Sequence, residues 1–331
     1  MTQATYTVVG LGNAIVDVLG NADDTFLILN QVTKGAMTLI DAARADQLYA
    51  AMGPAVEISG GSAANTIVGV AALGGRAAYL GKVRDDQLGE VFRHDIRAAG
   101  VTYDTPSATS GAPTARCLIL VTPDAQRSMN TFLGASVDLG PEDIDEALIL
   151  NSQVTYLEGY LWDPPRAKAA FLKAAALAHS GGRKVALSLS DSFCVNRHRP
   201  EFLDLVANHV DILFANEQEI SALYQSADFD QAVAAVRAVC PLVVLTRGAA
   251  GAVVVNGADI HEVPAEPVAQ VIDTTGAGDL FAAGFLFGHT NGRSLLDCAR
   301  IGAMAAGEII GHFGARPDVS LAELLRAKGL A

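Results

Sequence analysis

The stretch DTTGAGDLFAAGFLFG, residues 273–288, decides how this sequence folds and what chemistry it carries. Three residues with little or no side chain, Gly276, Ala277 and Gly278, precede an apolar segment of helical character that begins at about Asp279. Such a loop exposes backbone N–H groups at the positive end of a helix dipole, where an anion is stabilised. The stretch predicts a cradle for a phosphate or an oxyanion. A plain glycine turn with Asp279 as helix cap is the alternative.

Two acidic residues stand in surroundings that predict a chemical role. A carboxylate at Asp279 would repel an anion in the cradle unless it serves as a base or a metal ligand. Asp17 lies in the otherwise apolar segment AIVDVLG, residues 14–20. An isolated acid there must be solvated or paired, and two adjacent hydroxyls of a ligand would satisfy both of its oxygens.

A second glycine motif, SGGSAANT, covers residues 59–66. Gly60 and Gly61 let the backbone approach a ligand closely or act as a hinge. The amide of Asn65, on the first turn of the following helix, can both donate to and accept from a hydroxyl. An ordinary strand-to-helix turn with Ser62 as its cap is an equally open interpretation.

Working outward from these motifs, short apolar runs rich in β-branched residues recur along the chain. Because they are continuous and do not alternate, they predict strands covered on both faces. Segments of helical period, such as 62–73 and 165–179, lie between them, so we expect a mainly parallel α/β sheet flanked by helices on both faces. The predicted strands are 5–12, 76–83, 154–161, 184–190, 210–216 and 242–248.

Two stretches, residues 13–40 and 110–134, interrupt the alternation of strands and helices. In the second, ARCLILVT and RSMNTFLG flank the turn-prone PDAQ. We expect both stretches to form a small β-sheet that acts as a lid. The predicted organisation is one domain, 1–331, with a lid subdomain from about 13–40 and 110–134 and a large α/β body from the remainder.

Two further loops carry polar or glycine patterns at predicted strand ends. Asn216 and Glu219, in NEQE, follow a strand directly and could hold a hydrated magnesium ion, although capping of the next helix explains them equally. Gly248 and Gly251, in TRGAAGA (246–252), fit a hairpin turn whose glycines can pass close under a nucleotide.

Composition excludes several functional classes. The 36 acidic and 23 basic residues give a net charge of −13, which argues against binding along a nucleic acid backbone. The four cysteines lie dozens of residues apart, so we expect buried reduced thiols and no zinc site. No apolar run reaches the ~18 residues of a membrane span. The N-terminus lacks the pattern of a signal peptide, and we expect a cytoplasmic protein.

Two other glycine-containing stretches resemble known nucleotide-binding motifs but do not match them. GLGNAI, residues 10–15, opens like a dinucleotide fingerprint but has Ile15 where the third glycine belongs, which disfavours an oxidoreductase. GRAAYLGKV, residues 75–83, has five residues between Gly75 and Gly81 where a Walker A loop has four, and Val83 follows the lysine. We interpret it as a strand.

In this order and at these separations, the motifs resemble the ribokinase-like (PfkB) family of sugar and nucleoside kinases over nearly the whole chain. DTTGAGD resembles the family's C-terminal signature, and the glycine pair of SGGSAANT its N-terminal one. Other segments are more similar to adenosine kinases than to ribokinases: GLGNAIVD (10–17), GGSAAN (60–65), LSLSDSF (187–193) and VDILFANEQE (210–219).

The resemblance implies a ribokinase-like fold and a role for individual residues. Asp279 matches the catalytic base, and Gly276, Ala277 and Gly278 match the anion hole. Asp17 matches the ligand of the ribose hydroxyls, and Arg127, on the lid hairpin, is a candidate phosphate clamp beside Arg116 of the partner strand. Acceptor binding is implied for Asn13, Asp17, Gly60, Gly61, Ser62, Asn65 and Arg127; ATP binding for Asn216, Thr246, Gly248, Gly251, Gly276 and Gly278; and magnesium binding for Asn216 and Glu219.

The function that follows is an ATP-dependent kinase of the 5′-hydroxyl of a nucleoside, with adenosine and ATP giving AMP and ADP, a reaction of purine salvage. Kinases of guanosine, inosine, ribose or fructose remain alternatives, and so does a nucleoside-binding regulator without turnover. The implied cofactors are ATP and Mg²⁺, with K⁺ open. The implied partners are small molecules, with no nucleic acid and no membrane, and the chain is a monomer or a homodimer formed through the lid.

Overall fold

A computed structural model describes residues 4–124 and 126–330, and its main feature is an eight-stranded sheet in the order β13-β12-β11-β10-β9-β8-β1-β5. The strands from β5 to β11 are parallel, and β12 and β13 extend the sheet antiparallel. All six predicted strands lie in this sheet. The strands are β1 (Tyr6–Leu11), β5 (Ala77–Leu80), β8 (Ser152–Glu158), β9 (Lys184–Ser188), β10 (Ile212–Asn216), β11 (Leu242–Thr246), β12 (Ala252–Asn256) and β13 (Asp259–Val263).

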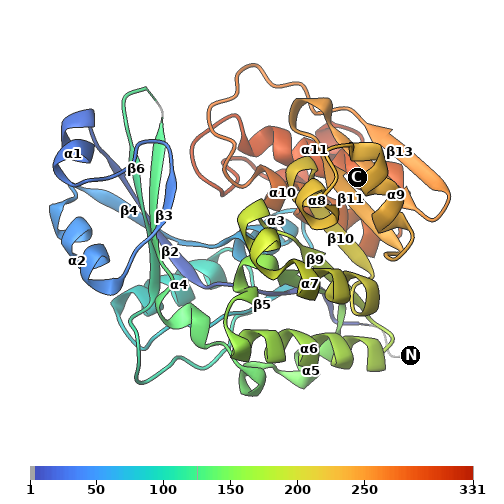
Figure 1. Ribbon diagram of the computed structural model, residues 1–331, viewed down its shortest axis with the longest axis horizontal. Helices are drawn as coiled ribbons and strands as arrows, with labels where there is room; N and C mark the ends of the chain where they lie inside the picture. The colour runs from blue at the N-terminus through green and yellow to red at the C-terminus, as the bar shows by residue number, and fades with distance from the viewer. Residues whose placement is uncertain (1–3, 125, 331) are drawn as a thin grey trace.

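Helices cover both faces of this sheet, as Figure 1 shows. Side chains alternate along a strand, so Val8 packs into the core beneath α3, α4, α10 and α11, while Val9 packs beneath α5 to α9. These helices are α3 (Ser62–Ala72), α4 (Gln87–Ala98), α5 (Glu146–Leu150), α6 (Pro165–Ser180), α7 (Ser192–Asn208), α8 (Glu217–Tyr224), α9 (Phe229–Arg237), α10 (Ala277–Thr290) and α11 (Leu295–Ile309), with α12 (Leu321–Ala327) after them. The arrangement confirms the ribokinase-like α/β fold.

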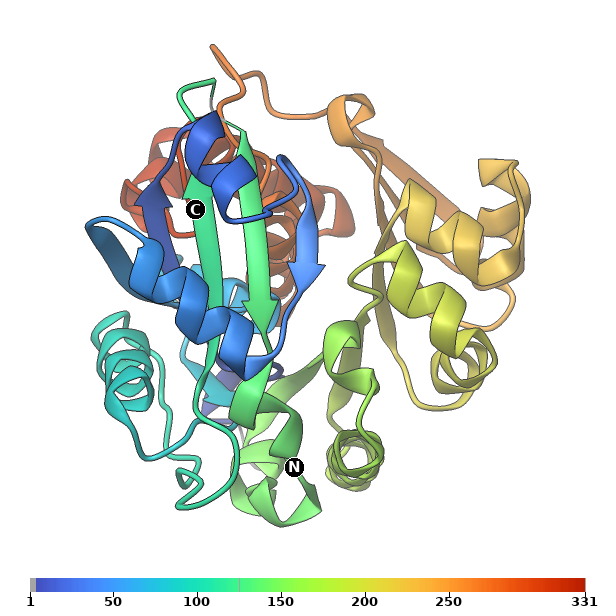
Figure 2. The same cartoon turned by 60° about the vertical axis from the view of Figure 1, so that its left-hand side comes forward.

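A second sheet of five strands, in the order β3-β7-β6-β2-β4, stands beside the body (Figures 1 and 2). Its strands are β2 (Ile15–Asn21), β3 (Met37–Leu39), β4 (Ala55–Gly60), β6 (Ala115–Val121) and β7 (Arg127–Phe132), and α1 (Asp24–Leu29) and α2 (Ala42–Ala51) pack on one of its faces. Both predicted stretches contribute strands, and β6 and β7 form the expected hairpin. β4 lies outside both predicted stretches.

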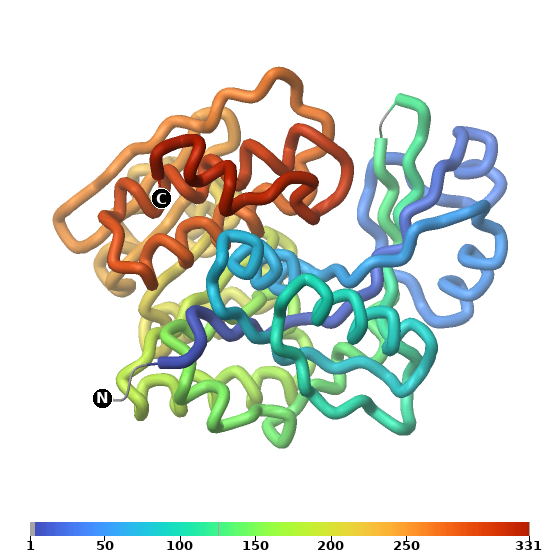
Figure 3. The backbone as a smooth tube through the Cα atoms, turned by 180° about the vertical axis from the view of Figure 1, so that it is seen from behind, coloured from blue at the N-terminus to red at the C-terminus, as the bar shows by residue number. Residues whose placement is uncertain are grey.

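The small sheet projects from the side of the body opposite the two ends of the described chain, as the view from behind shows (Figure 3). β1 of the body leads directly into its strand β2, and its strand β4 leads directly into α3 of the body. Its movement as a lid stays a prediction.

The composition-based expectations have structural counterparts. The four cysteines are free thiols, and all are buried. None of the helices in the described part of the chain combines the length and apolar character that crossing a membrane requires.

Candidate active site

The signature loop turns into α10 two residues earlier than the sequence suggested. Gly276, with φ of +79°, occupies the cap position, so Asp279 is the third residue of the helix and not its cap. A Cβ at Gly276 would come within 2.8 Å of the Cβ of Ala315, which explains the glycine there. A Cβ at Gly278 would meet no described atom within 4 Å, so the backbone is open on that side. The first N–H groups of a 14-residue helix therefore border open space.

The two glycine signatures meet at Asp279. Its Oδ1 accepts from the Ser62 hydroxyl at 2.6 Å, and its Oδ2 accepts from the Asn65 amide at 3.0 Å. Both partners lie on the first turn of α3, whose cap is Gly61 and not Ser62. Burial raises the pKa of Asp279, and these two hydrogen bonds and the charge of Arg316 oppose that rise. The carboxylate is thus fixed in orientation and is a stronger base than an exposed aspartate.

Asp17 lies on β2 beside Gly60, the last residue of β4. A Cβ at Gly60 would come within 2.3 Å of the Asp17 Oδ2, so the carboxylate occupies the space that a side chain would fill. Gly61 has φ of +97°, and a Cβ there would lie 2.3 Å from the Asn13 carbonyl oxygen. No hydrogen bond to the Asp17 carboxylate forms within residues 4–124 and 126–330. Burial raises the pKa of Asp17 to about 6, against the charges of Arg316 and Arg127.

Glu158, at the end of β8, was missed by the sequence analysis. It is 1% exposed and accepts from the Asn13 N–H at 3.1 Å, the Asn13 amide at 2.7 Å and the Ala63 N–H at 2.8 Å. The Oδ1 of Asn13 in turn accepts from Ser136 at 2.8 Å. Burial raises the pKa of Glu158 to about 7. Glu158 therefore joins the start of β2 to the first turn of α3, and an acid at the end of an apolar strand is the signal that could have identified it.

Arg127 and Arg116 lie on adjacent strands but point to different partners. Arg127 forms an ion pair with Asp273, the first residue of the signature, and both side chains are buried. Asp273 also accepts from the N–H and hydroxyl of Thr275. Arg116 pairs with Asp46 of α2, on the helix-covered face of the small sheet. Of the two arginines, Arg127 is the one that contacts the signature loop.

Asn216 and Glu219 form a reciprocal capping box at the start of α8. The Asn216 Oδ1 accepts from the Glu219 N–H at 2.9 Å, and Glu219 accepts from the N–H and amide of Asn216 at 2.9 and 2.6 Å. Burial raises the pKa of Glu219 to about 7. Asn216 stands opposite Thr246 in the parallel register of β10 and β11. The contact between Asn216 and Glu219 is thus the predicted helix cap. The Glu219 carboxylate is buried at this edge of the sheet.

The nucleotide-turn candidates lie one strand further along. Gly248 begins a short 3₁₀ turn between β11 and β12, and Gly251 follows it, as the hairpin interpretation predicted. Gly251 has φ of +89°, and a Cβ there would come within 2.0 Å of the Val263 carbonyl oxygen. A Cβ at Gly248 would meet no described atom within 4 Å. The turn therefore leaves its backbone open at Gly248.

Large side chains that could pack against a nucleobase do not gather in one place. Trp162 is 4% exposed and packs in the core against Phe171 and Phe202, while Phe193 is 81% exposed. Leu133 packs instead on a small apolar cluster of the second sheet, on the same face as Asp17: Ile15, Ala115, Cys117 and Ile119.

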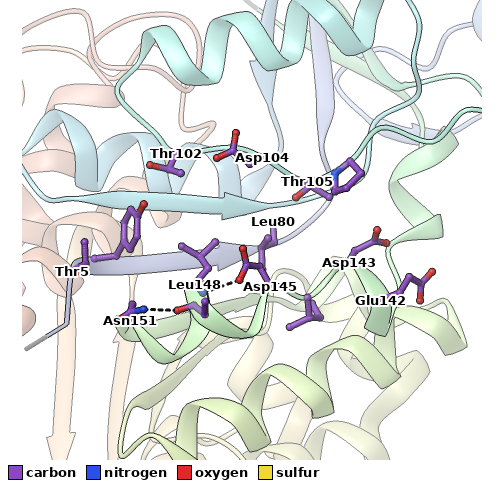
Figure 4. A pocket seen from close by; sticks show the side chains of 14 residues that line it. Thr5, Leu80, Thr102, Asp104, Thr105, Glu142, Asp143, Asp145, Leu148 and Asn151 are labelled. Atoms are coloured by element: carbon purple, nitrogen blue, oxygen red, sulfur yellow. Dashed lines mark hydrogen bonds between the residues drawn. The ribbon is translucent and has the colours of Figure 1, made fainter. Parts of the chain in front are cut away.

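A cavity of about 580 Å³ lies apart from all these residues, between the end of β5 and α5 (Figure 4). Three of its acids already have partners: Asp104 forms an ion pair with Arg97, Asp143 forms one with Lys82, and Asp145 caps α5. None of the predicted site residues lines it. In the described residues no group of three or more His, Cys, Asp or Glu side chains is arranged to hold a metal ion.

Comparison with known proteins agrees with the fold and the signatures. The structure of an adenosine kinase from Sinorhizobium meliloti is 57% identical with a TM-score of 0.92, over 98% of this chain and 100% of that chain. The structure of a probable sugar kinase from Rhizobium etli is 54% identical with a TM-score of 0.93, over 99% and 100%. An ATP-dependent ribose-1-phosphate kinase from Halopiger xanaduensis is 32% identical over 235 residues, 69% of this chain and 72% of the relative.

The family model described as pfkB family carbohydrate kinase matches residues 36–321. That range contains both glycine signatures and all the strands except β1 and β2. A kinase of this family transfers a phosphoryl group from ATP to a sugar or a nucleoside. The chain belongs to the pfkB family of carbohydrate kinases.

Proposed function

We propose that this kinase transfers the γ-phosphoryl group of ATP to the 5′-hydroxyl of a nucleoside, with adenosine as its preferred acceptor. One observation carries the chemistry. Asp279 stands on the first turn of α10, and Ser62 and Asn65 orient its carboxylate from the first turn of α3. A base beside a helix N-terminus is what an alcohol needs when it attacks a phosphate, because one group removes a proton and the other stabilises negative charge.

In the proposed reaction, the acceptor oxygen loses its proton to a carboxylate oxygen of Asp279 as it bonds to the γ-phosphorus. The bond between that phosphorus and the bridging oxygen of ATP breaks, and ADP leaves. The N–H groups of Gly276, Ala277 and Gly278 face the charge that gathers on the phosphoryl oxygens. Phosphoryl transfer needs positioning and charge stabilisation more than covalent help, and these residues supply both.

Acceptor binding rests on Asp17 and the glycine pair. The Asp17 carboxylate has space above Gly60 and no hydrogen bond within the described chain, so it can accept from the 2′ and 3′ hydroxyls of a ribose. Gly61 follows Gly60 and lies against the Asn13 carbonyl oxygen, and in this proposal Asn13 and Gly61 complete the ribose site. Binding of the two hydroxyls would favour the ionised form of Asp17, because hydrogen bonds to a carboxylate lower its pKa.

The apolar cluster beside Asp17 favours a nucleoside over a free sugar. Ile15 and Leu19 share the Asp17 face of β2, and Cys117 stands opposite Asp17 in the β2–β6 register. A purine ring needs an apolar surface of this kind next to the ribose, whereas a free sugar presents hydroxyls all round. Closure of the small sheet over the acceptor would bring this cluster onto the base and exclude water.

The donor side is formed by the ends of β10 and β11. Gly248 leaves the backbone open for the nucleotide, with Thr246 and Gly251 on either side, and Arg127 is close enough to the signature loop to reach a phosphate. The donor set of Asn216 and Glu219, one amide and one buried carboxylate, fits a magnesium ion that keeps most of its waters and arrives with ATP. When bound, that ion would neutralise phosphate charge.

The choice of adenosine rests on likeness to the Sinorhizobium meliloti adenosine kinase at 57% identity. The ribose-1-phosphate kinase and the probable sugar kinase among the similar proteins keep another nucleoside or a free sugar as the second candidate. A nucleoside-binding regulator without turnover is disfavoured, because a pure binding protein has no use for a base at a helix N-terminus.

The test is release of ADP from ATP and magnesium by the purified protein, with adenosine, guanosine, inosine, cytidine, ribose and fructose at equal concentrations. Selective turnover of adenosine is the expected result. Preference for another acceptor would leave Asp279 in its role and discard adenosine. Absence of turnover with every acceptor, while adenosine still binds, would favour the regulator.

A further inference from the structure

A segment of three residues after α11, residues 314–316, connects the N-terminus of α10 to the N-terminus of α3. The N–H of Gly314 donates to the Asp273 Oδ2 at 3.1 Å. Ala315 packs so tightly on Gly276 that a Cβ at Gly276 would lie 2.8 Å from its own. Residues 314 and 315 thereby support the signature loop on the side away from the open backbone of Gly278.

Arg316, the next residue, reaches the other helix. Its Nη1 donates to the Ala64 carbonyl oxygen at 3.1 Å, and its Nη2 donates to the carbonyl and, at 2.9 Å, to the hydroxyl oxygen of Ser59. Ala64 lies between the two residues of α3 that hold Asp279. No carboxylate of the described chain comes within the 4 Å of an ion pair with Arg316, so neutral oxygens alone hold this arginine in place.

We propose that Arg316 is a positioning residue for the phosphoryl transfer proposed above: it holds the first turn of α3 to the segment that packs on the signature loop, and so keeps Ser62 and Asn65 at hydrogen-bond distance from Asp279. The inference rests on that proposed function. The two hydrogen bonds to Asp279 join residues 217 and 214 positions apart in the chain, so no local structure fixes them. A misplacement of about 1 Å at a reacting group can lower a rate about 100-fold.

The positive charge of Arg316 has a second effect at the same place. The ionisable groups that face it are Asp17 on β2, Asp95 on α4, Asp279 on α10 and Tyr79 on β5. Burial raises the pKa of Asp17 and of Asp279, and the Arg316 charge acts against both rises. Because only the ionised form of Asp279 can accept a proton, loss of the charge should move the acidic limb of the pH profile to higher pH.

The experiment compares Arg316→Met, Arg316→Lys and a matched control, Arg93→Met. Arg93 on α4 lies outside the site; it donates to oxygens of Thr105 and Ser107 and also forms an ion pair with Glu90. ADP release with adenosine is measured from pH 5 to 9, together with Tm and the KM of both substrates. We expect Arg316→Met to lower kcat about tenfold or more, to change each KM by less than about threefold, and to shift the acidic limb upward.

The lysine variant separates the two effects. It keeps the charge but cannot span both carbonyls, so we expect the acidic limb to return while kcat recovers only in part. Arg93→Met should keep the wild-type kcat and the acidic limb of the wild-type pH profile. The proposal is overturned if Arg316→Met lowers Tm but leaves kcat per folded molecule and the acidic limb unchanged. If Arg316→Met does not fold, wild-type kcat in Arg316→Lys overturns it.

A readout without turnover separates this inference from the proposed function. If no acceptor is phosphorylated by the wild type, the proposed function has failed. The ¹³C carboxyl resonance of Asp279, assigned by comparison with Asp279→Asn, then measures the pKa of Asp279 without turnover. Its change between the variants shows the effect of Arg316 on that carboxylate. We expect its pH titration to move upward in Arg316→Met and to return in Arg316→Lys. The same titration in all three proteins overturns the inference.

Discussion

Replacement of the proposed base tests the site most directly. In Asp279→Asn the shape of the side chain is kept, and its carbonyl oxygen can still accept from Ser62. The new amide would face the Asn65 amide nitrogen, 3.0 Å from the present Oδ2. Asn65 can rotate its amide to meet it, because its own Oδ1 is buried and has no partner in the described chain. The variant should therefore keep the local geometry while losing the proton acceptor.

The magnitude follows from these contacts. General-base catalysis contributes about 10²–10⁴-fold, or about 3 to 5 kcal/mol of transition-state stabilisation. Because burial raises the pKa of Asp279, the ionised carboxylate lowers the free energy of unfolding at pH 7, and its removal should not lower Tm. We expect kcat to fall by at least about 100-fold. The Kd for adenosine should stay within about threefold of the wild-type value.

The assay is coupled detection of ADP, with adenosine binding measured by calorimetry on the same preparation. Asp143→Asn is the control, since Asp143 is a buried acid that pairs with Lys82 away from the site. A kcat within about tenfold of the wild type, in a variant that folds and binds adenosine, would refute the assignment of the base. A lower Tm with an unchanged kcat per folded molecule would also refute the assignment of the base.

Three further predictions concern the surroundings of the base. Glu158→Gln should flatten the pH dependence of stability: the raised pKa of about 7 means that the wild type loses up to about 3 kcal/mol of unfolding free energy as pH rises from 4.5 to 7, and urea unfolding at pH 5 and 7.5 measures it. Gly60→Ala would displace Asp17 and should raise the acceptor KM about tenfold, whereas Gly53→Ala, which meets nothing within 4 Å, should not; steady-state kinetics decide. Arg127→Met breaks a buried ion pair and should cost about 3 kcal/mol in chemical unfolding, and wild-type stability would contradict it.

The strands of the body could be predicted because each is a continuous apolar run, which only a sheet covered on both faces accommodates. β4 could not, because AVEISG has an exposed valine at its start and is buried only at Ser59 and Gly60. The start of α10 was predicted at about Asp279, two residues after its true start at Ala277. Asp279 has the residue type of a cap, but Gly276 in a left-handed conformation takes that position.

The candidate residues that carry local patterns were found in sequence, whereas those that act across the chain were not. Asp279, Asn65 and Asp17 belong to short motifs or stand out in apolar surroundings. Arg316 lies in a loop and contacts residues about 250 positions away, so no periodicity or spacing indicates it. Glu158 falls between these cases, since its position in an apolar strand is visible but its three donors are not.

The hydrogen bonds of the two partly buried aspartates support Asp279, and not Asp17, as the proposed base. Both carboxylate oxygens of Asp279 already accept a hydrogen bond, which fixes its plane and leaves a lone pair for one further proton. The Asp17 oxygens have no such bonds within the described residues, and Asp17 lies on β2 of the small sheet, opposite Cys117 of β6. A carboxylate free on both oxygens suits two hydroxyls that remain bound through the reaction. A carboxylate held rigidly beside an anion cradle suits the one hydroxyl that reacts. The proposed division of roles thus follows from which acid the first turn of α3 orients, and exchange of the two roles would require Asp17 to reach the N–H groups of Gly276 to Gly278.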